Sequence, residues 1–292
     1  MKLFLLFLFF ISTAYAEKEW KNPNGCPTTL PSFFGQRQHY TLSGDCQLYN
    51  PLGTSDYNNV YITSLDISIR GTRNNDSTTI DENTDLVTVF AYHGGNRHFY
   101  LNGENATLTL SYIKLVGGDV SSSSGNGGSI FIDDNGGELN LYSSIVFNNK
   151  AVFGGGIYAY GDSNTNKNDR IMNIDNSIIH NNTATYGDGG GIYMRNAVAA
   201  IENTTIDYNQ ASSDGGYGGG MSIVSSAVTM KNTNISNNKA GDRGGGLYIR
   251  GDSTTVTLRQ TSFIDNDATY QGDAIRTYLS PTISLINTYF NN

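Results

Sequence analysis

The acidic residues that could carry acid–base or metal chemistry lie in glycine-rich turns. Asp133-Asp134 is an adjacent pair, the residue type that general acid–base catalysis uses. Four more aspartates recur in or just before later glycine turns, namely Asp188, Asp214, Asp242 and Asp273. Carboxylates are ligands for Ca²⁺, but aspartate in a turn commonly bonds its own backbone. We interpret both groups as turn formers, with calcium binding as the alternative for the second.

The sequence does not identify a catalytic residue. The histidines His39, His93, His98 and His180 do not have the spacing of a metal site. No nucleophile-elbow motif marks a reactive serine. We therefore predict no metal and no cofactor, and the catalytic residues stay unknown.

Tyrosines and arginines form the candidate binding site. They recur at alternate positions of segments that follow glycine turns, as Tyr158, Tyr160, Tyr193, Arg195, Tyr248, Arg250, Arg276 and Tyr278, with Ser222 and Val224 in the same two columns. Aromatic rings offer an apolar face and a polar tip, and tyrosine and arginine are enriched at interfaces. We hypothesise a stripe that binds a carbohydrate or a cell-surface partner. The alternative is that both residue types simply suit exposed strand positions.

These residues lie within a repeat that runs from about residue 108 to the end. A hydrophobic anchor recurs every 27 to 33 residues, at Leu115, Val146, Ile179, Ile206, Ile235, Phe263 and Phe290. Asparagine follows three residues later, and alanine two residues after that, as in Asn209 and Ala211. A glycine-rich turn then opens the next segment, most clearly at 154–156, 189–191, 218–220 and 244–246.

Each repeat is strand-like, because its apolar residues alternate with period two. Ile157, Ile192, Met221, Leu247 and Ile275 form one apolar column after the glycine turns. Three short strands in roughly 28 residues indicate one coil of a parallel β-helix, whose apolar side chains are buried only by stacking on the next coil. The predicted fold is an all-β, single-stranded, right-handed parallel β-helix.

Glycine and asparagine then have structural roles at the corners. Glycine permits tight turns with positive φ, and stacked asparagines can bond from coil to coil. The sequence predicts two ladders, Asn149/Asn182/Asn209/Asn238/Asn266 and Asn176/Asn203/Asn232/Asn287, with Gln260 filling the missing rung of the second. If the second ladder is internal, Asn203 should be a poor glycan acceptor.

The N-terminus predicts export. Residues 1–16 have one Lys, an apolar run and an Ala-Tyr-Ala cleavage site, which is typical of a signal peptide. We expect a secreted protein, extracellular or at the cell surface, with no membrane span after cleavage. The predicted domains are a signal peptide at 1–16, an irregular cap at 17–39 and a parallel β-helix at 40–292. In an oxidising compartment Cys26 and Cys46 would pair as a disulfide.

Composition limits the partners. The 18 basic and 26 acidic side chains give a net charge of −8, which argues against nucleic-acid binding. Four N-x-S/T sites are glycosylation candidates in a secreted protein: Asn75, Asn105, Asn181 and Asn234. The oligomeric state is not predicted.

The repeat resembles two groups of known proteins. Phe263-Ile264-Asp265-Asn266, with the glycine turns that follow such segments, resembles the repeats of bacterial polymorphic outer-membrane proteins. More broadly the chain looks like the right-handed β-helix, or pectin-lyase-like, superfamily. The first resemblance implies surface display and adhesion, and the second also admits polysaccharide lyases and glycosidases.

The hydrolase motifs of that superfamily are incomplete here. Asn83-Thr84-Asp85 matches one of them, but the G-H-G and R-I-K partners are missing from the sequence. We therefore expect a non-catalytic β-helix for extracellular binding or adhesion, with a secreted polysaccharide-active enzyme as the alternative.

Overall fold

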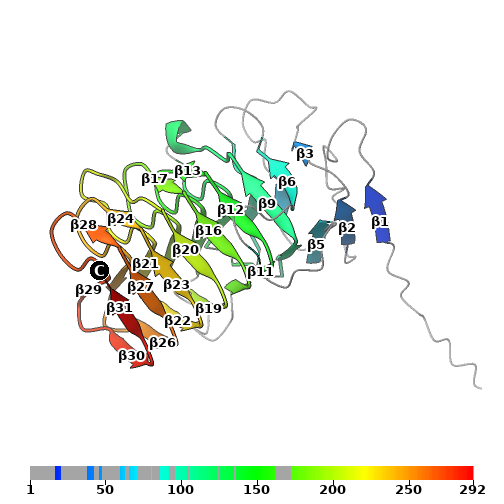
Figure 1. Cartoon of the computed structure of the whole chain (residues 1–292). Coiled ribbons are helices and arrows are strands. Elements are labelled where there is room, and N and C mark those ends of the chain that lie inside the picture. Colours follow the sequence, from blue (N-terminus) through cyan, green and yellow to red (C-terminus); the bar gives the residue numbers. More distant parts are fainter. Residues whose placement is uncertain are drawn as a thin grey trace, which may run out of the picture.

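The chain winds into a right-handed parallel β-helix (Figure 1). The structure is a computed structural model. It describes residues 86–91, 96–103, 105–123, 125–134, 136–161 and 172–291, with residue 80 and the segments 17–20, 38–42, 46–47, 60–62 and 66–71. The sequence prediction of a solenoid with coils of about 28 residues is confirmed.

Three parallel sheets run along the solenoid, and each full coil adds one strand to each of them. Sheet A contains β1 (Glu17–Trp20), β2 (Gln38–Leu42), β5 (Asp66–Gly71), β8 (Thr107–Ser111), β11 (Glu138–Tyr142), β15 (Met172–Asp175), β19 (Val198–Glu202), β22 (Ala227–Lys231), β26 (Thr255–Arg259) and β30 (Thr282–Ile286). Sheet B contains β3 (Cys46–Gln47), β6 (Val87–Phe90), β9 (Ile113–Val116), β12 (Ile145–Phe147), β16 (Ile178–His180), β20 (Thr205–Asp207), β23 (Asn234–Ser236), β27 (Ser262–Ile264) and β31 (Tyr289–Asn291).

Sheet C follows the glycine turns and carries the candidate site on its outer face. It contains β4 (Val60–Ile62), β7 (Phe99–Leu101), β10 (Ile130–Ile132), β14 (Ile157–Tyr160), β18 (Ile192–Arg195), β21 (Met221–Val224), β25 (Leu247–Arg250) and β29 (Ile275–Tyr278). Short pairs lie between sheets B and C, β13 (Lys150–Ala151) with β17 (Thr183–Ala184) and β24 (Lys239–Ala240) with β28 (Asp267–Ala268). A 3-10 turn, η1, spans Ser121–Ser123.

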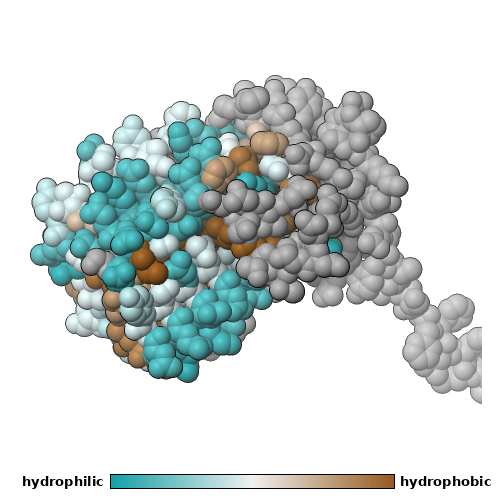
Figure 2. All heavy atoms as spheres, viewed as in Figure 1, coloured by the Kyte–Doolittle hydropathy of each residue, from teal (hydrophilic) through white to brown (hydrophobic). Residues whose placement is uncertain are grey.

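The core is a set of stacked apolar columns, as the sequence predicts. The anchors from Leu115 to Phe263 pair in register through sheet B and are fully buried. The last coil differs, because Leu285 is 51% exposed and Phe290 44%, whereas their partners Leu258 and Phe263 are buried. Figure 2 shows this apolar surface at the end formed by β30 and β31.

The glycine turns are required by close stacking of the coils. A Cβ atom on Gly190 would lie 2.3 Å from the carbonyl oxygen of Gly219 in the next coil. Gly218 adopts a φ of +68°, a conformation that residues with a Cβ rarely adopt. The glycines recurring in sequence are therefore structural.

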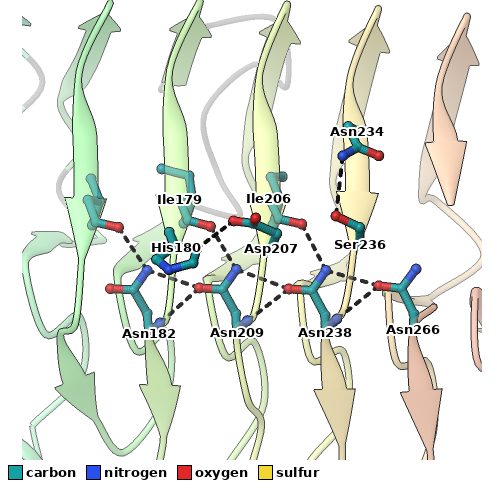
Figure 3. Close-up of polar contacts among 11 residues, drawn as sticks. Ile179, His180, Asn182, Ile206, Asp207, Asn209, Asn234, Ser236, Asn238 and Asn266 are labelled. Carbon is teal, nitrogen blue, oxygen red and sulfur yellow. Dashed lines mark hydrogen bonds and ion pairs between the residues drawn. The ribbon is translucent and has the colours of Figure 1, made fainter. Parts of the chain in front are cut away.

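The first asparagine ladder is internal (Figure 3). Asn182 donates from Nδ2 to Asn209 Oδ1 at 3.0 Å, and Asn209 donates to Asn238 Oδ1 at the same distance. Each amide oxygen also accepts the backbone N–H of the preceding rung, as from Asn182 N to Asn209 Oδ1. The ladder therefore joins successive coils and satisfies buried backbone groups.

The second set of asparagines lies outside the core. Asn176, Asn203, Asn232, Gln260 and Asn287 all have φ between 47° and 51°, so they form left-handed corners between sheets A and B. Asn232 donates to Asn203 at 2.9 Å, and Asn203 donates to Asp175. Asn203 is exposed. The idea that an internal ladder shields this sequon is therefore wrong.

Two predictions near the N-terminus fall mainly outside the described residues. The signal peptide lies there, as does Cys26 of the expected disulfide, whereas Cys46 is part of β3. Of the expected irregular cap at 17–39, the structure describes Glu17–Trp20 as β1 and the last two residues, Gln38 and His39, as the start of β2. These six residues belong to sheet A rather than to irregular structure.

Candidate functional site

The outer face of sheet C brings the predicted Tyr/Arg stripe together in two columns. Strand register places Tyr158, Tyr193, Ser222, Tyr248 and Arg276 side by side in the first column. It places Tyr160, Arg195, Val224, Arg250 and Tyr278 in the second. All eight predicted residues thus share one face, but their environments differ.

The first column is a stack of rings. Tyr158 and Tyr193 lie 5.0 Å apart with ring planes 5° apart, and Phe131 stacks on Tyr158 from the preceding coil. Tyr193 is 9% exposed and Tyr248 5%. Because the rings cover one another's faces, this part of the stripe is not an open aromatic platform.

The second column carries the exposed groups. The Arg195 guanidinium lies 5.8 Å from the ring centre of Tyr160, and that of Arg250 lies 5.6 Å from the ring centre of Tyr278. Arg195, Arg250 and Tyr278 are exposed, and Val224 lies between the two arginines. Cation–π contacts hold both guanidinium groups at the surface, where they can donate paired hydrogen bonds.

A further row of side chains flanks the first column, which the sequence analysis missed. It consists of the residues directly before each glycine turn: Phe153, Asp188, Tyr217, Arg243 and Gln271. Backbone bonds align them from coil to coil, as from Gly189 N to Tyr217 O and from Gly218 N to Arg243 O. Phe153 meets Tyr193 edge-on at 5.6 Å, and Tyr217 stacks on Tyr248 at 4.6 Å.

The residue types of this row vary, so its only signal in the sequence is the constant position before the first glycine. Of the five residues, only Asp188 is a candidate from the sequence, as a turn former.

Asp188 is the most perturbed carboxyl group of the site. Burial raises its pKa from 3.8 to about 6. The N–H of Tyr217, which donates to Oδ1 at 2.9 Å, and the charge of Arg250 lower that pKa, whereas the charge of Asp242 raises it. Asp188 can therefore change its charge near neutral pH.

Burial also affects the tyrosines. It raises the pKa of Tyr193 to about 12 and raises the pKa of Tyr158 and Tyr248 as well. Their hydroxyl groups therefore stay protonated and can donate hydrogen bonds.

Buried polar atoms without a hydrogen-bond partner gather here. In the part of the chain that the structure describes, these atoms are Ser222 Oγ, Asp242 Oδ1, Arg243 Nε and Arg276 Nε. Ser222 and Arg276 lie on the outer face of sheet C, Arg243 lies in the row beside it, and Asp242 directly precedes that row. Asp242 Oδ1 and Arg243 Nε form an ion pair at 3.2 Å. Unsatisfied buried groups are costly, so their concentration marks this surface as unusual.

The aspartates of the glycine turns serve local structure. Asp188 binds the backbone of Tyr217, Asp242 pairs with Arg243, and Asp273 accepts the N–H of Ala268. Asp214 differs from these three, because the bond shown for it is from its own backbone N–H to Ser212 Oγ. Within the described ranges, no three His, Cys, Asp or Glu residues gather in a way that could hold a metal ion.

The acidic pair Asp133-Asp134 is also held within a turn. Asp133 Oδ2 accepts hydrogen bonds from the Tyr100 hydroxyl and from Asn102, and Oδ1 accepts the N–H of Asp134. Asp133 therefore organises the turn after β10.

Two histidines lie away from this face. His98 is buried and contacts the carbonyl oxygen of Val89 and Ser129 Oγ, each at 3.0 Å. His180 pairs through Nδ1 with Asp207 at 2.8 Å on the outer face of sheet B (Figure 3). Ser236 pairs in register with Asp207 rather than with His180, so the three do not form a catalytic triad.

The glycosylation candidates differ in access. Asn105 and Asn181 are exposed, whereas Asn234 is partly buried and donates to Ser236 within β23. Asn75 lies outside the described residues.

Comparison with known proteins supports the fold. Residues 167–292 match a family model described as a right-handed beta helix region. No curated protein and no solved structure matches the chain. Helices long and apolar enough to cross a membrane are not found in the described part of the chain.

Proposed function

We propose that this chain is a secreted, non-catalytic β-helix protein that binds carbohydrate at an extracellular or cell surface through the outer face of sheet C. The observation that carries the proposal is that two buried polar atoms on this face, Ser222 Oγ and Arg276 Nε, have no hydrogen-bond partner. A ligand rich in hydroxyl groups would supply the missing partners.

The exposed column supports the same function. Arg195 and Arg250 stand on the surface beside Tyr160 and Tyr278, so their donors are held in place before a ligand arrives. Groups positioned in advance lose little freedom on binding. In the unliganded protein the ring stack is buried and forms a rigid base beside this column.

A glycan array tests the proposal. Wild-type protein should bind a limited set of glycans. The triple variant Arg195→Ala, Arg250→Ala, Tyr278→Ala should lose at least about a hundredfold in affinity, because the charged hydrogen bonds of the two arginines contribute about 1.5–3 kcal/mol each.

The matched control is the double variant Lys231→Ala, Arg259→Ala, which removes two cations from the outer face of sheet A. It should bind like wild type. Equal binding by the triple variant would contradict the assignment of the site, and no binding by any form would contradict the function.

One observation favours a second candidate, a polysaccharide-active enzyme. Asp188, with its pKa raised to about 6, lies near Arg250 and Asp242, and a carboxyl group of that kind can act as a general acid. Incubation with a panel of polysaccharides, followed by reducing-end and unsaturated-product assays, tests it. Turnover that falls about a hundredfold in Asp188→Asn would establish the enzyme and overturn the non-catalytic proposal.

A further inference from the structure

The aromatic column of sheet C is interrupted at one coil. Tyr193 and Tyr248 both pair in register with Ser222, so the strand between them lacks a ring. Neighbouring strands lie about 4.8 Å apart, which separates the two tyrosine positions by about 10 Å. That separation leaves room for one further ring between them.

Tyr217 supplies a ring at this level from outside the sheet. It belongs to the same coil as Ser222 and stacks on Tyr248 at 4.6 Å with ring planes 22° apart. It therefore covers Tyr248 at the level of the coil whose strand supplies no ring.

The loop before Tyr217 is longer than the loops of the neighbouring coils. From the repeat alanine to the first glycine of the turn, Ala211 to Gly218 spans seven residues. The corresponding spans are three from Ala151 to Gly154, five from Ala184 to Gly189, and four each from Ala240 to Gly244 and Ala268 to Gly272. The extra length thus occurs in the coil that lacks the strand aromatic.

The main chain of Tyr217 is fixed on one side by polar bonds. Its N–H donates to Asp188 Oδ1 at 2.9 Å, and its carbonyl oxygen accepts the N–H of Gly189. With these two bonds intact, the Tyr217 ring can leave the stack only by rotation of its side chain. The phenol bonds to Asp242, and that bond would break on rotation.

Ser222 places a hydroxyl group between Tyr193 and Tyr248. Its hydroxyl is fully buried and has no hydrogen-bond partner. Serine at this position therefore leaves a polar atom unsatisfied inside the stack, and a ligand ring with hydroxyl groups could satisfy it.

We propose that the space between Tyr193 and Tyr248 is a slot for one sugar ring of the bound glycan, which Tyr217 fills in the unliganded protein. This inference rests on the proposed function and specifies how the glycan is held. The ring would stack between two tyrosine faces, bond to Ser222, and meet Asp188 and Arg250 at the rim. These polar groups favour a sugar over an aromatic side chain of a partner protein.

Two substitutions test the slot with the glycans that wild type binds on the array. Tyr217→Ala removes the internal competitor and should raise affinity about fivefold, because an aromatic pair contributes about 0.5–1.5 kcal/mol. Ser222→Ala should lower affinity about fivefold while leaving the protein at least as stable, since it removes a hydroxyl that has no partner. Thermal unfolding reports that stability.

Tyr270→Ala is the matched control, because Tyr270 is an exposed tyrosine of the next-but-one loop, 73% accessible. It should bind like wild type. If both test variants bind like wild type while the triple variant Arg195→Ala, Arg250→Ala, Tyr278→Ala does not, the slot is overturned and the proposed function stands. If wild type binds no glycan, the proposed function fails and the slot with it.

Discussion

At the scale of single residues, buried polar groups differ in whether they find partners. His98 and the ladder asparagines are fully bonded inside the solenoid, whereas Ser222 is buried without a partner. The first group holds the coils together, and the second lies on the proposed binding face. Residue type alone does not separate them, because both are ordinary polar residues in a regular repeat.

His98 makes stability depend on pH. Burial lowers its pKa from 6.5 to about 4, so the unfolded chain takes up the proton first as the pH falls. The free energy of unfolding is fully retained above pH 6.5 and should decrease by roughly 3 kcal/mol as the pH falls from 6.5 to about 4. Urea unfolding at several pH values measures this dependence.

His98→Gln is the control for that measurement, because it keeps polar atoms at the site but cannot titrate. Its stability should change less than that of wild type over the same range. Asp188 acts in the opposite sense. Because its pKa is higher in the folded chain, at about 6, than its usual 3.8, protonation of Asp188 increases the free energy of unfolding as the pH falls below about 6. Identical pH dependence in wild type and His98→Gln would contradict the role assigned to His98.

At the scale of elements, the two sets of corner asparagines show how much of the structure the sequence predicts. The spacing locates both columns of asparagine, but it does not reveal which one is buried, nor that the outer column has only one Asn–Asn bond among the described contacts, from Asn232 to Asn203. The inner asparagines follow a corner residue with positive φ, such as Asn181 before Asn182, whereas the outer ones occupy that corner themselves. This difference depends on backbone φ angles, which cannot be read from the spacing of the repeat.

The ladders should therefore differ in their contribution to stability. Asn209→Ala removes the partners of Asn182 N, Asn182 Nδ2 and the Ile179 carbonyl oxygen, and should lower the free energy of unfolding by about 3–5 kcal/mol. Asn232→Ala in the exposed ladder should cost under about 1 kcal/mol. Urea titration of both variants measures the difference, and equal costs would contradict the two roles.

At the scale of the whole molecule, repetition made the fold predictable and the site only partly so. Anchors, glycine turns and strand alternation recur in every coil, so the solenoid and the face carrying the Tyr/Arg stripe follow from the sequence. The row of Phe153, Asp188, Tyr217, Arg243 and Gln271 does not, because its residue types vary and the loops before it differ in length. The burial of Tyr193 and Tyr248 arises from that row and from the ring stack.

The central claim is that the outer face of sheet C binds a glycan. Hydrogen–deuterium exchange of the protein with and without a glycan found on the array tests it most directly. We expect added protection in the segments around 153–160, 186–195, 213–224 and 241–250, which form sheet C and the row beside it. Protection confined to sheet A or to the outer face of sheet B, or no protection in these segments at saturating glycan, would contradict the account.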